Sequence, residues 1–177
     1  ILSGAGALAW VRLRPPRGAA FGWSSRGLWR QAAVWAAAAG IAIVPTLLIE
    51  RAVGSLLGRS SLDNPGVEMA VTILQGAPLV VTVGLICVVV PVLEETLFRG
   101  VIFRGLAARS GFWPAAVVSA LIFSLLHMSA VAAFPLFLLG LLFAWLCHRY
   151  QSLVAPAAAH GVYNALNLAI LVFVHGT

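Results

Sequence analysis

Residues 85–99 read LICVVVPVLEETLFR, so nine apolar residues run directly into two adjacent glutamates and, four positions later, an arginine. A charged side chain in the hydrocarbon core of a bilayer costs about 2.5–3.5 kcal/mol even on the lenient insertion scale. Such residues therefore face a protein interior or an aqueous cavity and are functional by default. This stretch predicts a membrane-embedded helix that carries polar groups into the interior of a helix bundle.

The composition of the whole chain points to lipid as its main solvent. Its 177 residues are 62% hydrophobic and 9% charged, whereas an ordinary soluble domain is about 25% charged. So few charges cannot cover the surface of a water-soluble protein of this size. We therefore predict an all-α, polytopic membrane bundle of about five to six transmembrane helices, with residues 1–177 forming a single membrane domain.

Five apolar runs approach the length of about 20 residues that spans a bilayer. They cover residues 31–49, 67–93, 113–128, 134–147 and 153–174. The second run is expected to continue as an Arg-bearing helix to about Arg109, with kinks at Pro78 and Pro91. A polar connection is expected over residues 50–66, which include the turn signal Asp63-Asn64-Pro65-Gly66.

The net charge of +6 comes from eleven basic residues, all of them arginine. They are not gathered into one patch, which argues against nucleic-acid binding. Five lie between residues 12 and 30, and others follow the second and fourth apolar runs. The positive-inside rule places these Arg-rich ends in the cytoplasm. Residues 1–30 are interpreted as the end of a preceding helix followed by an Arg-rich cytoplasmic segment.

Four polar side chains are predicted to share one layer of the bundle. Glu94 lies 17 residues before the turn at Gly111 and His127 lies 16 residues after it, so the two come level in an antiparallel hairpin. The same rise per residue places Glu94 about 15 Å and His160 about 13 Å deep. Asn164 follows His160 by one helical turn on the same face. We expect these four groups to converge near the middle of the membrane.

The two adjacent glutamates are expected to differ in role. Glu95 and Arg99 are spaced i, i+4 and can form a salt bridge. Glu94 then has no obvious cation and can act as a general base. Simpler readings stay open: Glu94 can be a charge in headgroup water, and His127 and His160 can be hydrogen bonders between helices. Asn167 is expected to bond a neighbouring helix.

The predicted layer contains the groups that amide hydrolysis requires. A carboxylate can take a proton from water, and an imidazole can position that water or donate to a leaving amine. A second histidine and an asparagine can donate hydrogen bonds to a developing oxyanion. The two cysteines, Cys87 and Cys147, lie in apolar runs without metal or disulfide spacing. The pattern favours a hydrolase that forms no covalent intermediate.

Three short motifs carry a family resemblance. Residues 94–100, EETLFRG, match the EExxxR motif of the CAAX protease and bacteriocin-processing family, also called CPBP or Abi. Residues 123–127, FSLLH, resemble its FxxxH motif, and residues 160–164, HGVYN, resemble its HxxxN motif. The motifs occur in the family's order on separate predicted helices, and residues 67–175 would form the catalytic core.

The resemblance implies an intramembrane, metal-independent glutamic peptidase related to the Ras-converting CAAX proteases. It implies no cofactor, and as partners it implies the lipid bilayer and a peptide or protein substrate at the membrane, lipidated or bacteriocin-like. We expect a multi-pass protein of a bacterial plasma membrane whose site opens to the cytoplasm. The implied roles are: Glu94 as base, His127 as activator of water, His160 and Asn164 as the oxyanion site, and Glu95 and Arg99 as supports.

Two other functions remain open at this level. Glu94, His127 and His160 could together ligate Zn²⁺ in a metalloprotease, although the chain has no HExxH helix. The chain could also be a non-enzymatic accessory or immunity protein that keeps the same fold.

Overall fold

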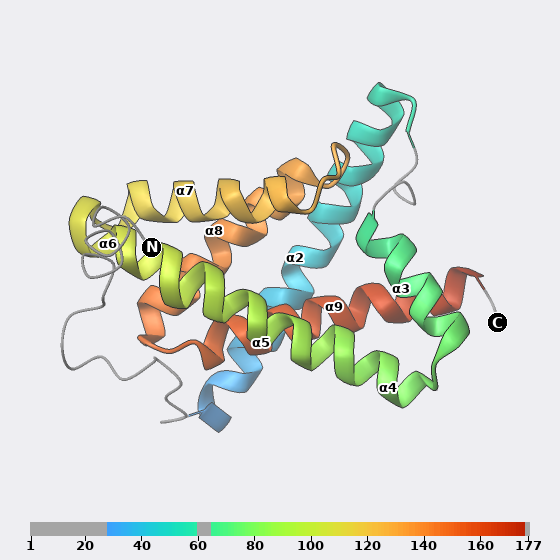
Figure 1. The fold of residues 1–177 in the computed structure, drawn as a ribbon, viewed down its shortest axis with the longest axis horizontal. Coiled ribbons are helices and arrows are strands. Elements are labelled where there is room, and N and C mark those ends of the chain that lie inside the picture. Colours follow the sequence, from blue (N-terminus) through green and yellow to red (C-terminus); the bar gives the residue numbers. More distant parts are fainter. Residues whose placement is uncertain (1–27, 60–64, 176–177) are drawn as a thin grey trace, which may run out of the picture.

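The computed structural model describes residues 28–59 and 65–175, and all the regular elements in these ranges are helices (Figure 1). They are α2 (Leu28–Leu57), α3 (Pro65–Gly76), α4 (Leu79–Gly84), η1 (Leu85–Val89), α5 (Val90–Glu95), η2 (Thr96–Phe103), α6 (Arg104–Ser110), α7 (Phe112–Leu126), α8 (Ala133–Tyr150) and α9 (Val154–His175). The elements η1 and η2 are π-helical. The predicted segment before residue 28 and the Asp63-Asn64 turn lie outside the described residues.

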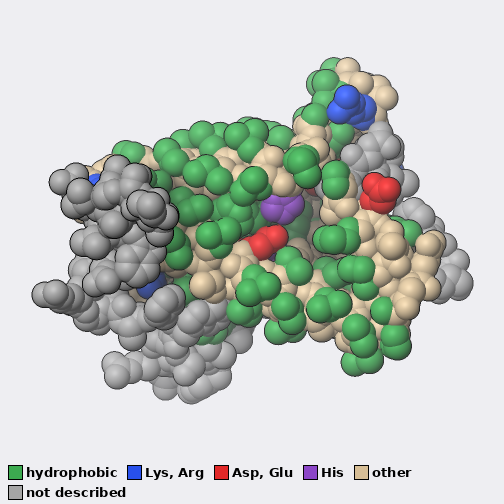
Figure 2. Space-filling view, viewed as in Figure 1, with side chains coloured by type: hydrophobic (Ala, Val, Ile, Leu, Met, Phe, Trp, Pro, Cys, Tyr) green, Lys and Arg blue, Asp and Glu red, His purple; other side chains and the backbone are tan. Residues whose placement is uncertain are grey.

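Four of the described helical stretches are long and apolar enough to cross a membrane. They are Ala37–Leu57, Leu79–Ser110, Ala133–Tyr150 and Val154–Phe173. The predicted span at α7 is a shorter apolar helix of 15 residues. Hydrophobic side chains cover much of the face in Figure 2, as expected where lipid replaces water. The prediction of an all-α, multi-pass membrane bundle is confirmed.

The helix α2 is longer than the sequence analysis predicted. It runs to Leu57, so Glu50 and Arg51 lie on a helix and not in a polar connection. The helix ends at Gly58, whose φ of +62° is the left-handed conformation that glycine adopts readily. The backbone N–H of Arg59 then donates to the carbonyl of Gly54 at 2.9 Å. Gly58 is the sequence signal that marks the end of α2, and the prediction did not use it.

The second apolar run forms two helices and not one. The short helix α3 ends at Gly76, and Pro78 precedes α4 with φ −56° and ψ 142°. Proline lacks an N–H and disfavours helical conformation in the residue before it, so Pro78 ends one helix where a kink was expected. The helical stretch from α4 to α6 continues through Pro91, preceded by the π-helical η1.

The long stretch from α4 to α6 lies against the other helices and supplies the first of the predicted motifs. Its elements η1 and α5 pack against α9, while η2 packs against α7 and α8. The helices α7 and α8 form a hairpin, and α2 packs against α9 and crosses it (Figure 1). All three predicted motifs are thereby brought to adjoining helices.

Two glycines allow helices in this bundle to approach closely. A Cβ atom at Gly140 of α8 would lie 2.8 Å from the Cβ of Ala120 on α7. A Cβ atom at Gly161 of α9 would overlap the carbonyl oxygen of Cys87 in η1. Real Cβ atoms do not make such contacts. Both helix pairs can therefore pack this closely only because these two residues are glycine.

We predict that Gly140→Ala lowers the free energy of unfolding by about 1–3 kcal/mol, because the added methyl overpacks the α7–α8 contact. The matched control is Gly84→Ala, since a Cβ there meets nothing within 4 Å. That control should be neutral or stabilising by up to about 1 kcal/mol. Equal shifts of the two variants in a denaturing-detergent titration would contradict this packing account.

Candidate active site

A buried ion pair lies at the centre of the site. A guanidinium nitrogen of Arg99, Nη1, lies 2.9 Å from Oε1 of Glu95, and both side chains are 0% exposed. The second nitrogen, Nη2, donates to the carbonyl of Gly140 on α8 at 3.1 Å. The salt bridge predicted from the i, i+4 spacing is confirmed, and it also ties η2 to α8.

Three aromatic rings surround the guanidinium of Arg99. Its central carbon lies 4.6 Å from the ring centre of Phe123, 5.3 Å from Phe143 and 5.7 Å from Phe98. A guanidinium is weakly hydrated and stacks well on aromatic faces, so such rings can replace water around it. Sequence analysis did not identify these rings as part of the site, although Phe123 lies in the FxxxH motif.

His160 is held by the same carboxylate. Its Nδ1 lies 3.1 Å from Oε1 of Glu95, and its ring stacks on Phe143 at 4.9 Å. A hydrogen on Nδ1 that bonds a carboxylate leaves Nε2 as the free nitrogen of a neutral ring. That Nε2 faces Oε2 of Glu94 at 3.7 Å, which is longer than a hydrogen bond. The bond from His160 to Glu95 was not predicted.

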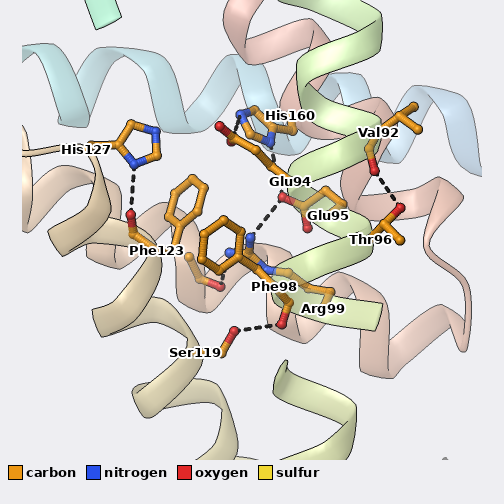
Figure 3. A network of polar contacts seen from close by, with 11 residues as sticks. Val92, Glu94, Glu95, Thr96, Phe98, Arg99, Ser119, Phe123, His127 and His160 are labelled. Carbon is orange, nitrogen blue, oxygen red and sulfur yellow. Dashed lines mark hydrogen bonds and ion pairs between the residues drawn. The ribbon is translucent and has the colours of Figure 1, made fainter. Parts of the chain in front are cut away.

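Glu94 differs from its neighbour in surroundings. Its side chain is 27% exposed, against 0% for Glu95. Its Oε2 atom is buried, and no group among the described residues donates a hydrogen bond to it. Figure 3 shows Glu95 directed toward Arg99 and Glu94 directed toward His160. The adjacent glutamates therefore have separate environments: Glu95 is fully buried, and Glu94 is partly exposed.

His127 reaches the same region from the end of α7. The helix ends at Leu126, and Met128 takes a positive φ of 51°. The Nδ1 atom of His127 bonds the carbonyl of Phe123 at 2.8 Å, and its ring lies edge-on to the Phe123 ring at 4.7 Å. With Nδ1 as the donor, Nε2 is the free nitrogen of the neutral ring. The motif phenylalanine thus positions the motif histidine.

Asn164 has a partner that sequence analysis missed. Directly after η1, the N–H of Val90 donates to the carbonyl of Leu85, five residues earlier. The next N–H in that register would come from Pro91, which has none. The carbonyl of Ile86 is therefore free of the helix, and Nδ2 of Asn164 donates to it at 2.9 Å. Pro91 and the π-helical turn together create the acceptor that Asn164 uses.

The hydrogen bond of Asn167 differs from the one predicted. It was expected to bond a neighbouring helix, but its Nδ2 donates to the carbonyl of Tyr163 at 3.0 Å, within α9. A polar side chain one turn from a helix carbonyl can satisfy its donor locally.

One cavity of about 900 Å³ joins the predicted residues. Glu94, His127, His160 and Asn164 all line it, while the Glu95–Arg99 pair lies buried behind them. Figure 2 shows an acidic side chain and a histidine together beside a hollow in the hydrophobic face. Among the described residues, no three His, Cys, Asp or Glu side chains are grouped so as to hold a metal ion.

Comparison with known proteins gives two matches. The family model described as "Type II CAAX prenyl endopeptidase Rce1-like" matches residues 76–166, which contain all the predicted site residues. The "Putative membrane peptidase YdiL" of Bacillus subtilis (strain 168) is 31% identical over 108 residues, which are 61% of this chain and 42% of that protein. The chain thus spans less than half the length of this relative. No solved structure matches the chain significantly.

We predict that Arg99→Met lowers the free energy of unfolding by about 3–5 kcal/mol, because it leaves the Glu95 carboxylate buried without its cation. Arg149→Met is the matched control, since Arg149 is exposed on the last turn of α8. Its effect should stay within about 0.5 kcal/mol. Chemical denaturation of both variants in the same detergent measures the difference, and a loss of under 1 kcal/mol for Arg99→Met would contradict the assignment.

Proposed function

Because the chain belongs to the Rce1-like family of type II CAAX prenyl endopeptidases, we propose that it is a metal-independent intramembrane peptidase. In this proposal, water activated by Glu94 and His127 hydrolyses a peptide bond of a membrane-associated or lipidated substrate. The observation that carries the proposal is the separation of the two glutamates. Glu95 is held in a buried ion pair, while Glu94 lines the cavity beside two histidines.

Glu94 is the proposed general base. A catalytic base must be reachable by the water from which it takes a proton. The partial exposure of the Glu94 side chain on the cavity wall supports this role. Its Oε2 is buried and receives no hydrogen bond from the described residues, so that atom is not engaged by another group. His127 lines the same cavity with its Nδ1 occupied by Phe123. Its Nε2 is then available to position the same water.

His160 is proposed to take up the proton that Glu94 removes. The nearest approach of the two side chains joins Oε2 of Glu94 and Nε2 of His160 at 3.7 Å, so a small movement suffices for transfer. The resulting imidazolium would be stabilised by the carboxylate of Glu95, which bonds its Nδ1. Its Nε2–H could then donate to the oxyanion or to the leaving amine.

Asn164 is the proposed second donor to the oxyanion. Its amide nitrogen has two hydrogens, and one of them is directed to the carbonyl of Ile86. The other is available to a substrate in the cavity that Asn164 lines. The bond to Ile86 would hold the amide in place before substrate binds, which is the preorganisation that an oxyanion site requires.

The location of the site supports a membrane substrate. The cavity is lined mainly by apolar side chains of membrane-length helices, which suits an apolar or lipid-attached peptide. The arginines near the ends of the second and fourth predicted spans favour cytoplasmic access to it. The mechanism invokes no metal, since protein side chains supply the base and the donors.

We predict that Glu94→Gln abolishes cleavage while the protein remains folded, because the amide cannot accept the proton from water. The measurement is comparative proteomics of membrane peptides from cells expressing the wild type or the variant. Glu68→Gln is the matched control, since Glu68 is exposed on α3 and does not line the cavity.

The expected result is a set of peptides whose cleavage disappears in Glu94→Gln and persists in Glu68→Gln. Unchanged cleavage in folded Glu94→Gln protein would refute the proposed mechanism. Retained biological function in a Glu94→Gln, His127→Ala double variant would instead support the non-enzymatic alternative.

A further inference from the structure

Glu50 is a second carboxylate on the wall of the same cavity. It lies within the candidate span Ala37–Leu57 and lines the cavity together with Glu94. Its side chain is only partly exposed. No hydrogen bond or ion pair joins the Glu50 carboxylate to any other residue that the structure describes. The proposed hydrolysis does not use it, so its presence at membrane depth is unexplained.

The neighbouring arginine does not neutralise Glu50. Arg51 also borders the cavity, but its side chain is exposed. Consecutive residues of a helix point about 100° apart and do not face each other. A carboxylate in a mainly apolar wall is costly when it has no cation nearby. A ligand that carries a positive charge would remove this cost.

The contacts between α2 and α9 place Glu50 relative to the catalytic groups. The hydroxyl of Tyr163 donates to Oγ1 of Thr46 at 3.0 Å. Glu50 lies one turn beyond Thr46 on α2, and it lines the cavity together with His160, Tyr163 and Asn167 of α9.

We propose that Glu50 selects substrates that carry a lysine or arginine at a fixed distance from the bond that is cut. This inference rests on the proposed function and adds a substrate class to it. The cationic side chain pairs with the Glu50 carboxylate, and the apolar wall of the cavity holds the rest of the peptide. Arg51, exposed at the same end of the cavity, disfavours a second basic residue there.

Binding can be measured separately from cleavage. The protein is the full chain carrying Glu94→Gln, in nanodiscs of neutral phosphatidylcholine, so that Glu94 cannot itself attract the cation. The probes are three fluorescent, acylated Leu/Ala peptides that differ only in bearing Lys, Gln or Glu at one position. Shifting that position along the peptide locates the preferred register.

We expect the Lys probe to bind about tenfold more tightly than the Gln probe, in line with one partly desolvated ion pair. Adding Glu50→Gln should reduce this preference to less than twofold, and Glu50→Arg should reverse it in favour of the Glu probe. Glu50→Asp, which keeps the charge with a smaller structural change, should retain the preference. Glu68→Gln, outside the cavity, should leave it unchanged.

Equal binding of the three probes, or a Lys preference that survives Glu50→Gln, would overturn the inference. The proposed function is tested apart from it, by adding the Lys probe to protein with Glu94 intact. A probe that binds through Glu50 and is never cleaved contradicts the peptidase mechanism but supports the cation site.

Discussion

The carboxylate of Glu95 and the guanidinium of Arg99 meet in the interior of a membrane protein, with both side chains fully buried. Burying two such charges costs less when their remaining hydrogen-bonding capacity is met. The carbonyl of Gly140 and the Nδ1 of His160 meet part of it, and three aromatic rings lie against the guanidinium. Among the described residues, Oε2 of Glu95 and Nε of Arg99 have no hydrogen-bond partner. Because the groups that contact the pair come from α8, α7 and α9, one ion pair sets the positions of several helices.

The same pair determines the chemistry proposed for Glu94. Arg99 is engaged by Glu95, so the adjacent glutamate keeps its carboxylate for the cavity. A second interaction, the hydrogen bond from Asn164 to the carbonyl of Ile86, positions a residue of α9 on the cavity wall. Pro91 and the π-helical turn before it free the carbonyl of Ile86, and Asn164 bonds that carbonyl. Since His160 lies one turn before Asn164, this bond and the one to Glu95 together orient the α9 residues of the site.

Sequence reasoning predicted the features that depend on spacing and composition. The apolar composition predicted the helix bundle, and the i, i+4 spacing predicted the Glu95–Arg99 pair. Nearly equal separations from Gly111 predicted that Glu94 and His127 lie at one level, and in the structure both line one cavity. It missed the features that depend on partners distant in the chain.

The π-helical turn before Pro91 leaves the carbonyl of Ile86 without a bond inside its own helix, and Asn164 of α9 donates to it. The spacing of residues along one helix cannot predict a partner on another helix. The continuation of α2 beyond Glu50 was missed for a local reason, because the glycine stop at Gly58 was overlooked.

The central claim is that Arg99 is coupled to Glu95 and not to Glu94. Two double-mutant cycles on the free energy of unfolding test it, one pairing Arg99→Met with Glu95→Gln and the other pairing Arg99→Met with Glu94→Gln. The account predicts a coupling of more than about 1 kcal/mol in the first cycle and additivity within about 0.5 kcal/mol in the second. Equal couplings, or a larger one for Glu94, would contradict it.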